Sequence, residues 1–172
     1  MNRSVCRNFR RRLLLGIGLA GVTPFTASLV HAQRSGSTNA DQSAQQSAAN
    51  LAVLQRYVAA LRTGSGAKLY HPEFTTHYFG DNPFAGDHVG KDAAVKTLSE
   101  FNRRVNRKIL NVVDVLAGSK FAAMITRESF ERNGERVELE RVLVYTVKDG
   151  LLEECWVYDR NQRLVDRLLA DV

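Results

Sequence analysis

The sequence predicts an α+β domain in which helices come first and an antiparallel sheet follows. Residues 109–158 contain four consecutive β-rich runs, and the last three are joined by Asn133-Gly134 and Asp149-Gly150. Both dipeptides favour the positive φ angles of a type I′ turn, so they predict two tight hairpins. Two amphipathic helical patterns precede these runs. Helices followed by a meander predict a sheet with helices packed on one face.

The chain begins with the three parts of an export signal, which we place at residues 1–32. Residues 7–12 are basic, residues 13–30 are weakly apolar and rich in glycine, and Val30-His31-Ala32 is a small-x-small cleavage pattern. The run RRRLL at residues 10–14 resembles a twin-arginine signal, with a general secretory signal as the alternative. The apolar stretch is short and interrupted for a membrane span. We therefore expect a periplasmic or secreted protein that has no membrane association after the signal is removed.

The positive charge of the chain belongs mainly to this signal. The formal net charge is +6, from 24 basic and 18 acidic residues, and five of the basic residues precede residue 13. The rest of the chain is therefore almost neutral, which gives no support for nucleic-acid binding. The histidines show no metal-ligand spacing, and we expect neither a metal nor another cofactor.

The remaining elements follow from periodicity and turn residues. Residues 33–47 are small and polar, and we expect a disordered linker there, followed by one folded domain over residues 48–172. Apolar residues at helical spacing predict a first helix between Ser47 and Gly64 and a second from about residue 91 to Val105. A strand over residues 74–79 and a loop over residues 80–86 lie between them, and a short helix over residues 161–169 ends the domain.

The two turns also predict which side chains share a face of the sheet. We assume that strand pairing continues without interruption from each turn, so that Arg132 lies opposite Glu135 and Lys148 lies opposite Leu151. The face with the larger side chains should lie under the helices, and it carries Met124, Thr126, Glu128, Phe130, Val137, Leu139, Arg141, Leu143, Tyr145, Leu152, Glu154, Trp156 and Tyr158. The opposite face carries Phe121, Ile125, Arg127, Glu138, Glu140, Val142, Val144, Glu153, Cys155 and Val157.

Two segments resemble a known family. Residues 74–86, followed by Gly90-Lys91-Asp92-Ala93 and a helix, are similar to the SnoaL-like group of the nuclear transport factor 2-like superfamily, and so are residues 144–153 leading to Trp156. The resemblance covers about residues 48–170. It implies a curved antiparallel sheet wrapped around N-terminal helices, which forms a cone-shaped pocket (a cystatin-like α+β barrel). The superfamily includes ketosteroid isomerases, polyketide cyclases, dehydratases and epoxide hydrolases, as well as proteins without known activity.

The resemblance also implies candidate catalytic residues. Isomerases of this superfamily place an oxyanion-binding Tyr on the first helix, and Tyr57 matches that position. Their catalytic base is an Asp on the first strand, where this sequence has His77, which we take as the candidate base. Their second oxyanion donor falls at Leu143, and the pocket Trp of some isomerases matches Trp156. With both carboxylates missing, ketosteroid isomerisation itself is not expected.

Further side chains are expected to bind substrate in the cone. Arg141 with Glu128 or Glu154 could hold an anionic substrate or position a water, and a structural ion pair is the alternative. The aromatic residues Phe84, Phe101 and Tyr145 should contact the ligand or fill the cone. We expect Asp159, at the end of the last strand, to cap the following helix.

Two kinds of function stay open. One is an exported, cofactor-independent acid–base enzyme (an isomerase, cyclase, dehydratase or hydratase) acting on a small apolar molecule. The other is a non-catalytic module of the same fold that binds a ligand or a protein. The face bearing Phe121 and Val142 is too apolar to be fully solvated, and we expect a homodimer through this outer sheet face.

Overall fold

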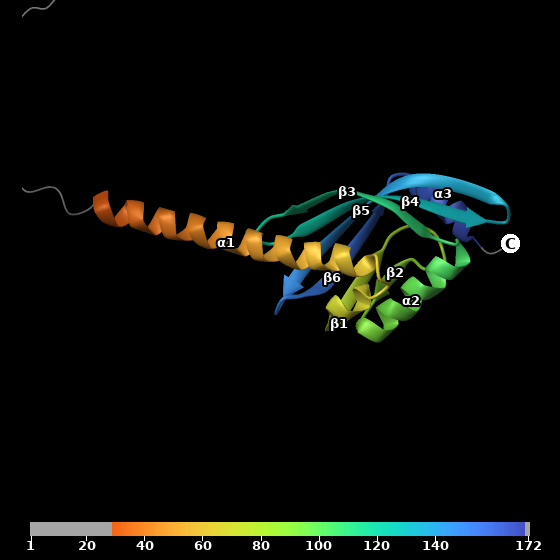
Figure 1. The fold of residues 1–172 in the computed structure, drawn as a ribbon, viewed down its shortest axis with the longest axis horizontal. Helices are drawn as coiled ribbons and strands as arrows, with labels where there is room; N and C mark the ends of the chain where they lie inside the picture. The colour runs from red at the N-terminus through yellow and green to blue at the C-terminus, as the bar shows by residue number, and fades with distance from the viewer. Residues whose placement is uncertain (1–28, 171–172) are drawn as a thin grey trace, which may run out of the picture.

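The computed structural model describes residues 29–170, so most of the predicted export signal lies outside the described part of the chain. Three helices, one short 3-10 turn and six strands form the described fold (Figure 1). In chain order they are α1 (Leu29–Leu61), η1 (Gly66–Leu69), β1 (Tyr70–Tyr78), β2 (Gly86–His88), α2 (Lys91–Arg104), β3 (Lys108–Ala117), β4 (Ala122–Arg132), β5 (Glu135–Lys148), β6 (Leu151–Asp159) and α3 (Gln162–Leu169). The order predicted from the sequence is confirmed, apart from the short strand β2.

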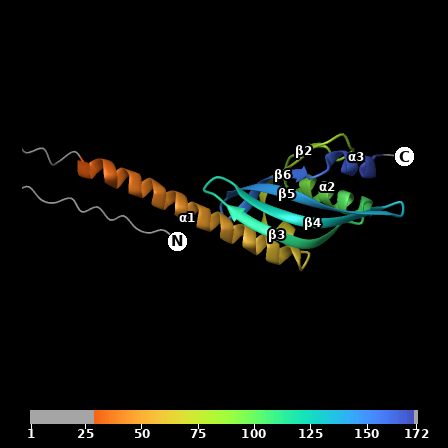
Figure 2. The same ribbon diagram turned by 90° about the horizontal axis from the view of Figure 1, so that it is seen from above.

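The strands form one curved, open sheet in the order β2-β1-β6-β5-β4-β3 (Figures 1 and 2). All neighbouring pairs are antiparallel except β1 and β6, which run parallel. The predicted curved sheet is confirmed, and it is antiparallel except at this one pairing. β1 precedes α2 in the chain, yet it pairs with β6, the last strand. This contact joins distant parts of the sequence, and no turn residues in the sequence indicate it.

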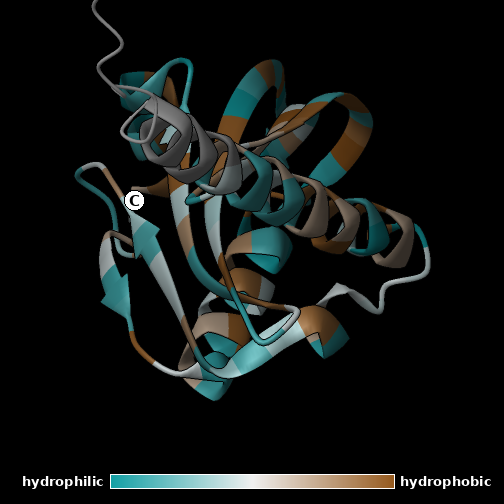
Figure 3. Ribbon diagram, turned by 90° about the vertical axis from the view of Figure 1, so that its left-hand side faces the viewer, coloured by the Kyte–Doolittle hydropathy of each residue, from teal (hydrophilic) through white to brown (hydrophobic). Residues whose placement is uncertain are grey.

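The helices cover the concave face of the sheet. The C-terminal half of α1 packs against β3 and β4, and α2 packs against β1. Fully buried side chains from α1, β1, β4 and β5, such as Leu54, Phe74, Met124 and Tyr145, form the core between these layers. Hydrophobic and hydrophilic residues alternate along the strands, as a sheet with one covered face requires (Figure 3).

Helix α1 is longer than predicted. It runs through residues 33–47, where we expected a disordered linker, and its N-terminal half extends away from the rest of the fold (Figure 1). Residues 38–46 are exposed, which explains why they show no apolar period. Asn50 marks the start of the packed part, since its side-chain amide donates to the backbone oxygens of Gly118 and Ser119. Forming the first turn of a helix is energetically unfavourable, and packing against the sheet stabilises the C-terminal turns of α1. The exposed N-terminal turns extend the helix from these packed turns. No described helix combines the length and apolarity needed to cross a bilayer.

Both predicted hairpin turns are confirmed by their backbone angles. Asn133 and Gly134 have φ angles of 53° and 78°, and Asp149 and Gly150 have φ angles of 52° and 72°. The first hairpin then pairs without interruption from Arg132 opposite Glu135 to Ala122 opposite Tyr145, as expected. The sequence pattern therefore predicted correctly which side chains of β4 and β5 face the helices.

The second hairpin departs from the predicted register after two pairs. Val147 lies opposite Leu152 as predicted, but Thr146 lies opposite Glu154, so Glu153 is an extra residue in a β-bulge. A bulge reverses the alternation of side chains beyond it. The prediction that Glu154, Trp156 and Tyr158 face the helices is therefore wrong.

The residues on the inner face of β6 are instead the alternate set. Cys155 and Val157 are 4% and 2% exposed and belong to the core, although they were assigned to the outer face. Tyr158 is 47% exposed. The side chain of Asp159 is fully buried and does not cap α3, because that role belongs to Asn161, whose side chain accepts a hydrogen bond from the backbone of Leu164.

Candidate functional site

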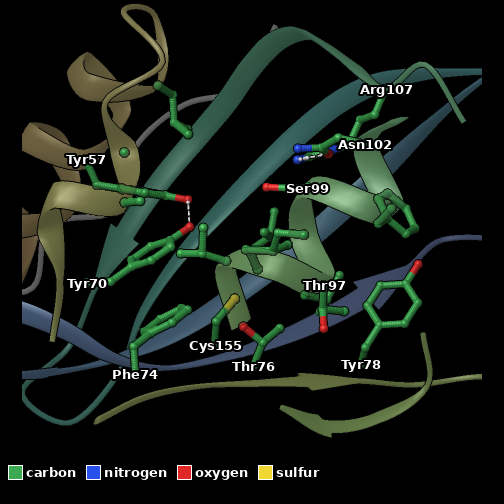
Figure 4. A pocket seen from close by; sticks show the side chains of 18 of the residues that line it. Tyr57, Tyr70, Phe74, Thr76, Tyr78, Thr97, Ser99, Asn102, Arg107 and Cys155 are labelled. Atoms are coloured by element: carbon green, nitrogen blue, oxygen red, sulfur yellow. Dashed lines mark hydrogen bonds between the residues drawn. The ribbon is translucent and has the colours of Figure 1, made fainter. Parts of the chain in front are cut away.

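A cavity of about 650 Å³ lies in the cone between the concave face of the sheet, the end of α1 and helix α2 (Figure 4). Its wall is mostly apolar and aromatic. Six of the residues predicted to form the site line it, namely Tyr57, Phe84, Phe101, Arg141, Leu143 and Tyr145. The volume remains open although Phe84, Phe101 and Tyr145 all reach the cavity wall.

Three tyrosines meet at one end of the cavity. The hydroxyl groups of Tyr57 and Tyr70 are 2.7 Å apart, and both point towards the cavity in Figure 4. The ring of Tyr145 packs edge-on against Tyr57, with the ring centroids 5.6 Å apart. Burial raises the pKa of all three hydroxyls, so each stays neutral and able to donate a hydrogen bond near neutral pH.

A glycine allows this arrangement. A Cβ atom at Gly66 would lie 3.0 Å from Cε2 of Tyr57, closer than ordinary packing permits. Because glycine has no side chain, η1 can pass directly over the Tyr57 ring. Tyr70, which follows η1 in the chain, then lies at the same end of the cone.

Four charged side chains, three of them buried and that of Arg107 13% exposed, form a network at the opposite end. Arg107 donates to both carboxylate oxygens of Glu128, at 2.6 and 2.5 Å, and Arg141 donates to Glu128 at 3.2 Å. Arg141 also donates to Asp159 at 2.6 Å and to the hydroxyl of Tyr78 at 3.1 Å. Every charged group in the network therefore has a partner.

The network determines the charge of this wall of the cavity. Burial opposes ionisation of Glu128, but Arg107 and Arg141 outweigh it and hold the pKa of Glu128 at about 2. Two cations and two anions leave no net charge. Of the two interpretations of Arg141 offered by the sequence, the contacts support a structural ion pair, with Asp159 and Glu128 as partners and without Glu154.

The prediction that His77 lies in the pocket is wrong. Its neighbours on β1, Thr76 and Tyr78, line the cavity, so the alternation of the strand places His77 on the outer face. Its Nδ1 lies 2.8 Å from Asp87, and its Nε2 lies 3.1 Å from Glu154. The inward residue next to the expected position of a base is Tyr78, and burial raises the pKa of its hydroxyl.

Trp156 and Glu154, which we predicted in the pocket, lie on the same outer surface as His77. The Trp156 ring stacks on the His77 ring, with centroids 4.8 Å apart, and meets Phe121 edge-on. The β6 bulge is the cause, since it reverses the facing of both residues. This outer cluster does not line the cavity.

Several cavity residues were missed by sequence reasoning. His88, which the sequence analysis did not single out, lines the cavity, and its ring nitrogens contact the carbonyl oxygen of Phe84 and the hydroxyl of Thr97. A carbonyl only accepts, so Nε2 of His88 carries a proton and donates it to the carbonyl oxygen of Phe84. Thr76 and Cys155 also line the cavity. The period-two pattern of β1 could have indicated Thr76, whereas Cys155 depended on the bulge.

The cone and its cavity define a cystatin-like α+β protein of the nuclear transport factor 2-like fold. No family model matches the sequence, and no curated protein is significantly similar to it. Solved structures match over most of their length, and all three described next are at most 21% identical, which shows the fold alone.

Three of these structures illustrate the match. A protein of unknown function with a cystatin-like fold from Xanthomonas campestris has a TM-score of 0.65 and 21% identity, over 71% of this chain and 98% of its own. A nuclear transport factor 2-like protein from Burkholderia xenovorans LB400 has a TM-score of 0.60 and 16% identity, over 72% and 98%. A candidate SnoaL-like polyketide cyclase from Jannaschia sp. CCS1 has a TM-score of 0.57 and 14% identity, over 73% and 95%.

Proposed function

We propose that this protein binds a small, uncharged and largely apolar molecule in the cone. The observation that carries the proposal is the open cavity of about 650 Å³, which combines an apolar wall with buried hydroxyl groups. Small-molecule sites commonly enclose about 300–1,000 Å³ and have a few polar groups in an apolar wall. A cone filled by Phe84, Phe101 and Tyr145 would have favoured a module that only binds proteins.

The charges of the wall support an uncharged ligand. The guanidinium groups of Arg107 and Arg141 are both neutralised by buried carboxylates. The tyrosines Tyr57, Tyr70 and Tyr145 remain neutral, because burial raises the pKa of each hydroxyl. A ligand charge buried against Arg107 and Arg141 would find both guanidinium groups already paired, so they would not offset its desolvation. The description of the Jannaschia protein as a polyketide cyclase agrees with a small organic ligand.

Two further proposals concern the setting of this function. The pattern of residues 1–32 supports export. The outer face of the sheet supports a homodimer, because Phe121 and Val142 are 43% and 37% exposed there. Arg127 and Glu138 on the same face already pair with each other, so this apolar and self-neutralised surface suits a second identical copy.

Native mass spectrometry of protein purified from the exporting cell tests these proposals together. We expect a dimer of chains that lack residues 1–32, with a small molecule bound to each. Leu143→Trp places an indole in the cavity and should reduce ligand occupancy at least ~10-fold, equivalent to about 1.4 kcal/mol. Trp156→Ala changes the outer face and should leave occupancy unchanged. Equal occupancy in wild type and a folded Leu143→Trp variant would place the ligand elsewhere.

A cofactor-independent acid–base enzyme is the second candidate, favoured by the paired hydroxyls of Tyr57 and Tyr70. A neutral tyrosine hydroxyl can donate to an oxyanion as it forms. The histidine that lines the same cavity is His88, in place of the predicted His77.

The enzyme hypothesis predicts a large effect of one hydroxyl. If the compound released from the purified protein is converted to a new product, Tyr57→Phe should lower the rate constant kcat by roughly 10²–10³-fold, the usual loss for one oxyanion donor. Tyr158→Phe removes an exposed hydroxyl on the outer face and is the matched control. Conversion that is equally fast in the Tyr57→Phe variant would exclude Tyr57 from catalysis.

A further inference from the structure

Three cavity residues lie side by side across three neighbouring strands. Tyr145 on β5 is opposite Cys155 on β6, and Cys155 is opposite Thr76 on β1. All three line the cavity, and they are 1%, 4% and 2% exposed. We call Tyr145, Cys155 and Thr76 the inner row. Figure 4 shows Thr76 and Cys155 of this row beneath the space that Tyr57 and Tyr70 face from one side.

The two ends of the inner row carry hydroxyls that no group of the described chain satisfies. The Oγ1 atom of Thr76 and the hydroxyl of Tyr145 are buried, and neither makes a hydrogen bond within residues 29–170. A buried polar group without a partner costs about 1–3 kcal/mol, and folded proteins leave few of them. Other buried polar groups of the wall are engaged, since Tyr57 pairs with Tyr70 and Arg141 binds two carboxylates.

The placement of these hydroxyls restricts what could satisfy them. They lie two strands apart, so their backbones are separated by roughly 10 Å. The inner row carries no charge, and burial raises the pKa of the Cys155 thiol to about 12, so this group also stays neutral. Next to the row, the rings of Tyr70 and Phe74 stack with centroids 3.9 Å apart and an interplanar angle of 4°, so two parallel aromatic rings line the cavity there.

We propose that the inner row is a hydrogen-bonding subsite that selects a flat, uncharged ring compound carrying oxygen atoms at two separated positions. The hydroxyls of Tyr145 and Thr76 each take one oxygen of the ligand as partner. This proposal rests on the proposed binding function and adds a specificity determinant to it. The apolar wall holds the ring, and the inner row discriminates oxygenated rings from plain ones.

The test compares two probes of similar shape, naphthalene and 2,6-dihydroxynaphthalene, by equilibrium dialysis against the full mature protein. Wild type should bind the diol more tightly. Tyr145→Phe and Thr76→Val remove one hydroxyl each with little change of shape, and each should reduce the preference for the diol by roughly 5–10-fold, the effect of one hydrogen bond. Naphthalene affinity should stay within about twofold of wild type.

The chain offers a matched control in Thr146. Its hydroxyl is also buried and without a partner, but Thr146 does not line the cavity. Thr146→Val should therefore leave the preference unchanged. Thermal unfolding of the ligand-free variants separates specificity from structure, because removing an unsatisfied hydroxyl should not lower the midpoint Tm.

The possible outcomes distinguish the proposed subsite from the proposed binding function on which it rests. If both probes bind and the preference is the same in wild type, Tyr145→Phe and Thr76→Val, the inner row is not a subsite, although the cone still binds ligands. If Tm falls in both variants, the hydroxyls serve the fold and the inference is also overturned. If neither probe binds to folded protein, the proposed binding function fails, and the inner row fails with it.

Discussion

Glu128→Gln is expected to lower the free energy of unfolding by about 3–5 kcal/mol. Glutamine nearly preserves the shape of the side chain but removes the charge that both Arg107 and Arg141 use. Breaking a buried ion pair from one side leaves an uncompensated charge in a medium that solvates it poorly. Arg107 then has no carboxylate partner, because its remaining hydrogen bond goes to the amide oxygen of Asn102.

Urea unfolding followed by circular dichroism measures this effect. Glu138→Gln is the matched control, since Glu138 pairs with Arg127 and Arg136 at the surface, where an ion pair contributes at most about 1 kcal/mol. A loss below about 1 kcal/mol for Glu128→Gln as well would show that the two arginines find solvent or other partners. The ion network would then not determine the neutral character of the cavity wall.

Acidification should destabilise the protein through the same carboxylate. The pKa of Glu128 is about 2 in the folded protein, against an ordinary value of 4.5. A depressed folded-state pKa stabilises the fold fully above the unfolded value, and that stabilisation is lost as the pH falls through the folded value. We therefore expect a loss of about 3 kcal/mol from this one group between about pH 4.5 and pH 2.

The pH dependence of the urea midpoint measures this loss, and Glu128→Gln isolates it. The variant has no proton to take up at this position, so its stability should fall less steeply than that of wild type over the same range. Exposed carboxylates such as Glu73 and Glu135 also have lowered pKa values and add a shallow slope to both proteins. Parallel pH profiles of the two proteins would contradict the assignment of the depressed pKa to Glu128.

Two consequences of the register bear on function. The Glu153 bulge removes Trp156 from the cavity and brings in Cys155, the centre of the inner row. It also turns Asp159 inward, where this residue completes the partners of Arg141. Without Asp159, the guanidinium of Arg141 at the cavity wall would have only the Glu128 carboxylate as a partner, and it shares that carboxylate with Arg107. The neutral wall, and with it the proposal of an uncharged ligand, therefore depends on one extra residue in β6.

The sequence by itself determined the features that depend on neighbouring residues. Asn133-Gly134 and Asp149-Gly150 specify their turns through backbone angles that few other residues adopt, and the alternation of β4 and β5 continues directly from the first turn. For the same reason Arg141, Leu143 and Tyr145 could be assigned to the cavity wall before the fold was known, whereas Tyr57 was assigned from the resemblance to the isomerases.

Only the tertiary structure decided the arrangement of β6 and β1. Residues 151–158 are apolar or large on both faces, so their pattern allows either register, and the choice depends on packing β6 between β5 and β1 at once. The parallel pairing of β1 with β6 joins residues about 80 positions apart and places His77 beside Trp156 on the outside. Such contacts are determined by which side chains the core can enclose, a property of the whole sheet that local patterns do not carry.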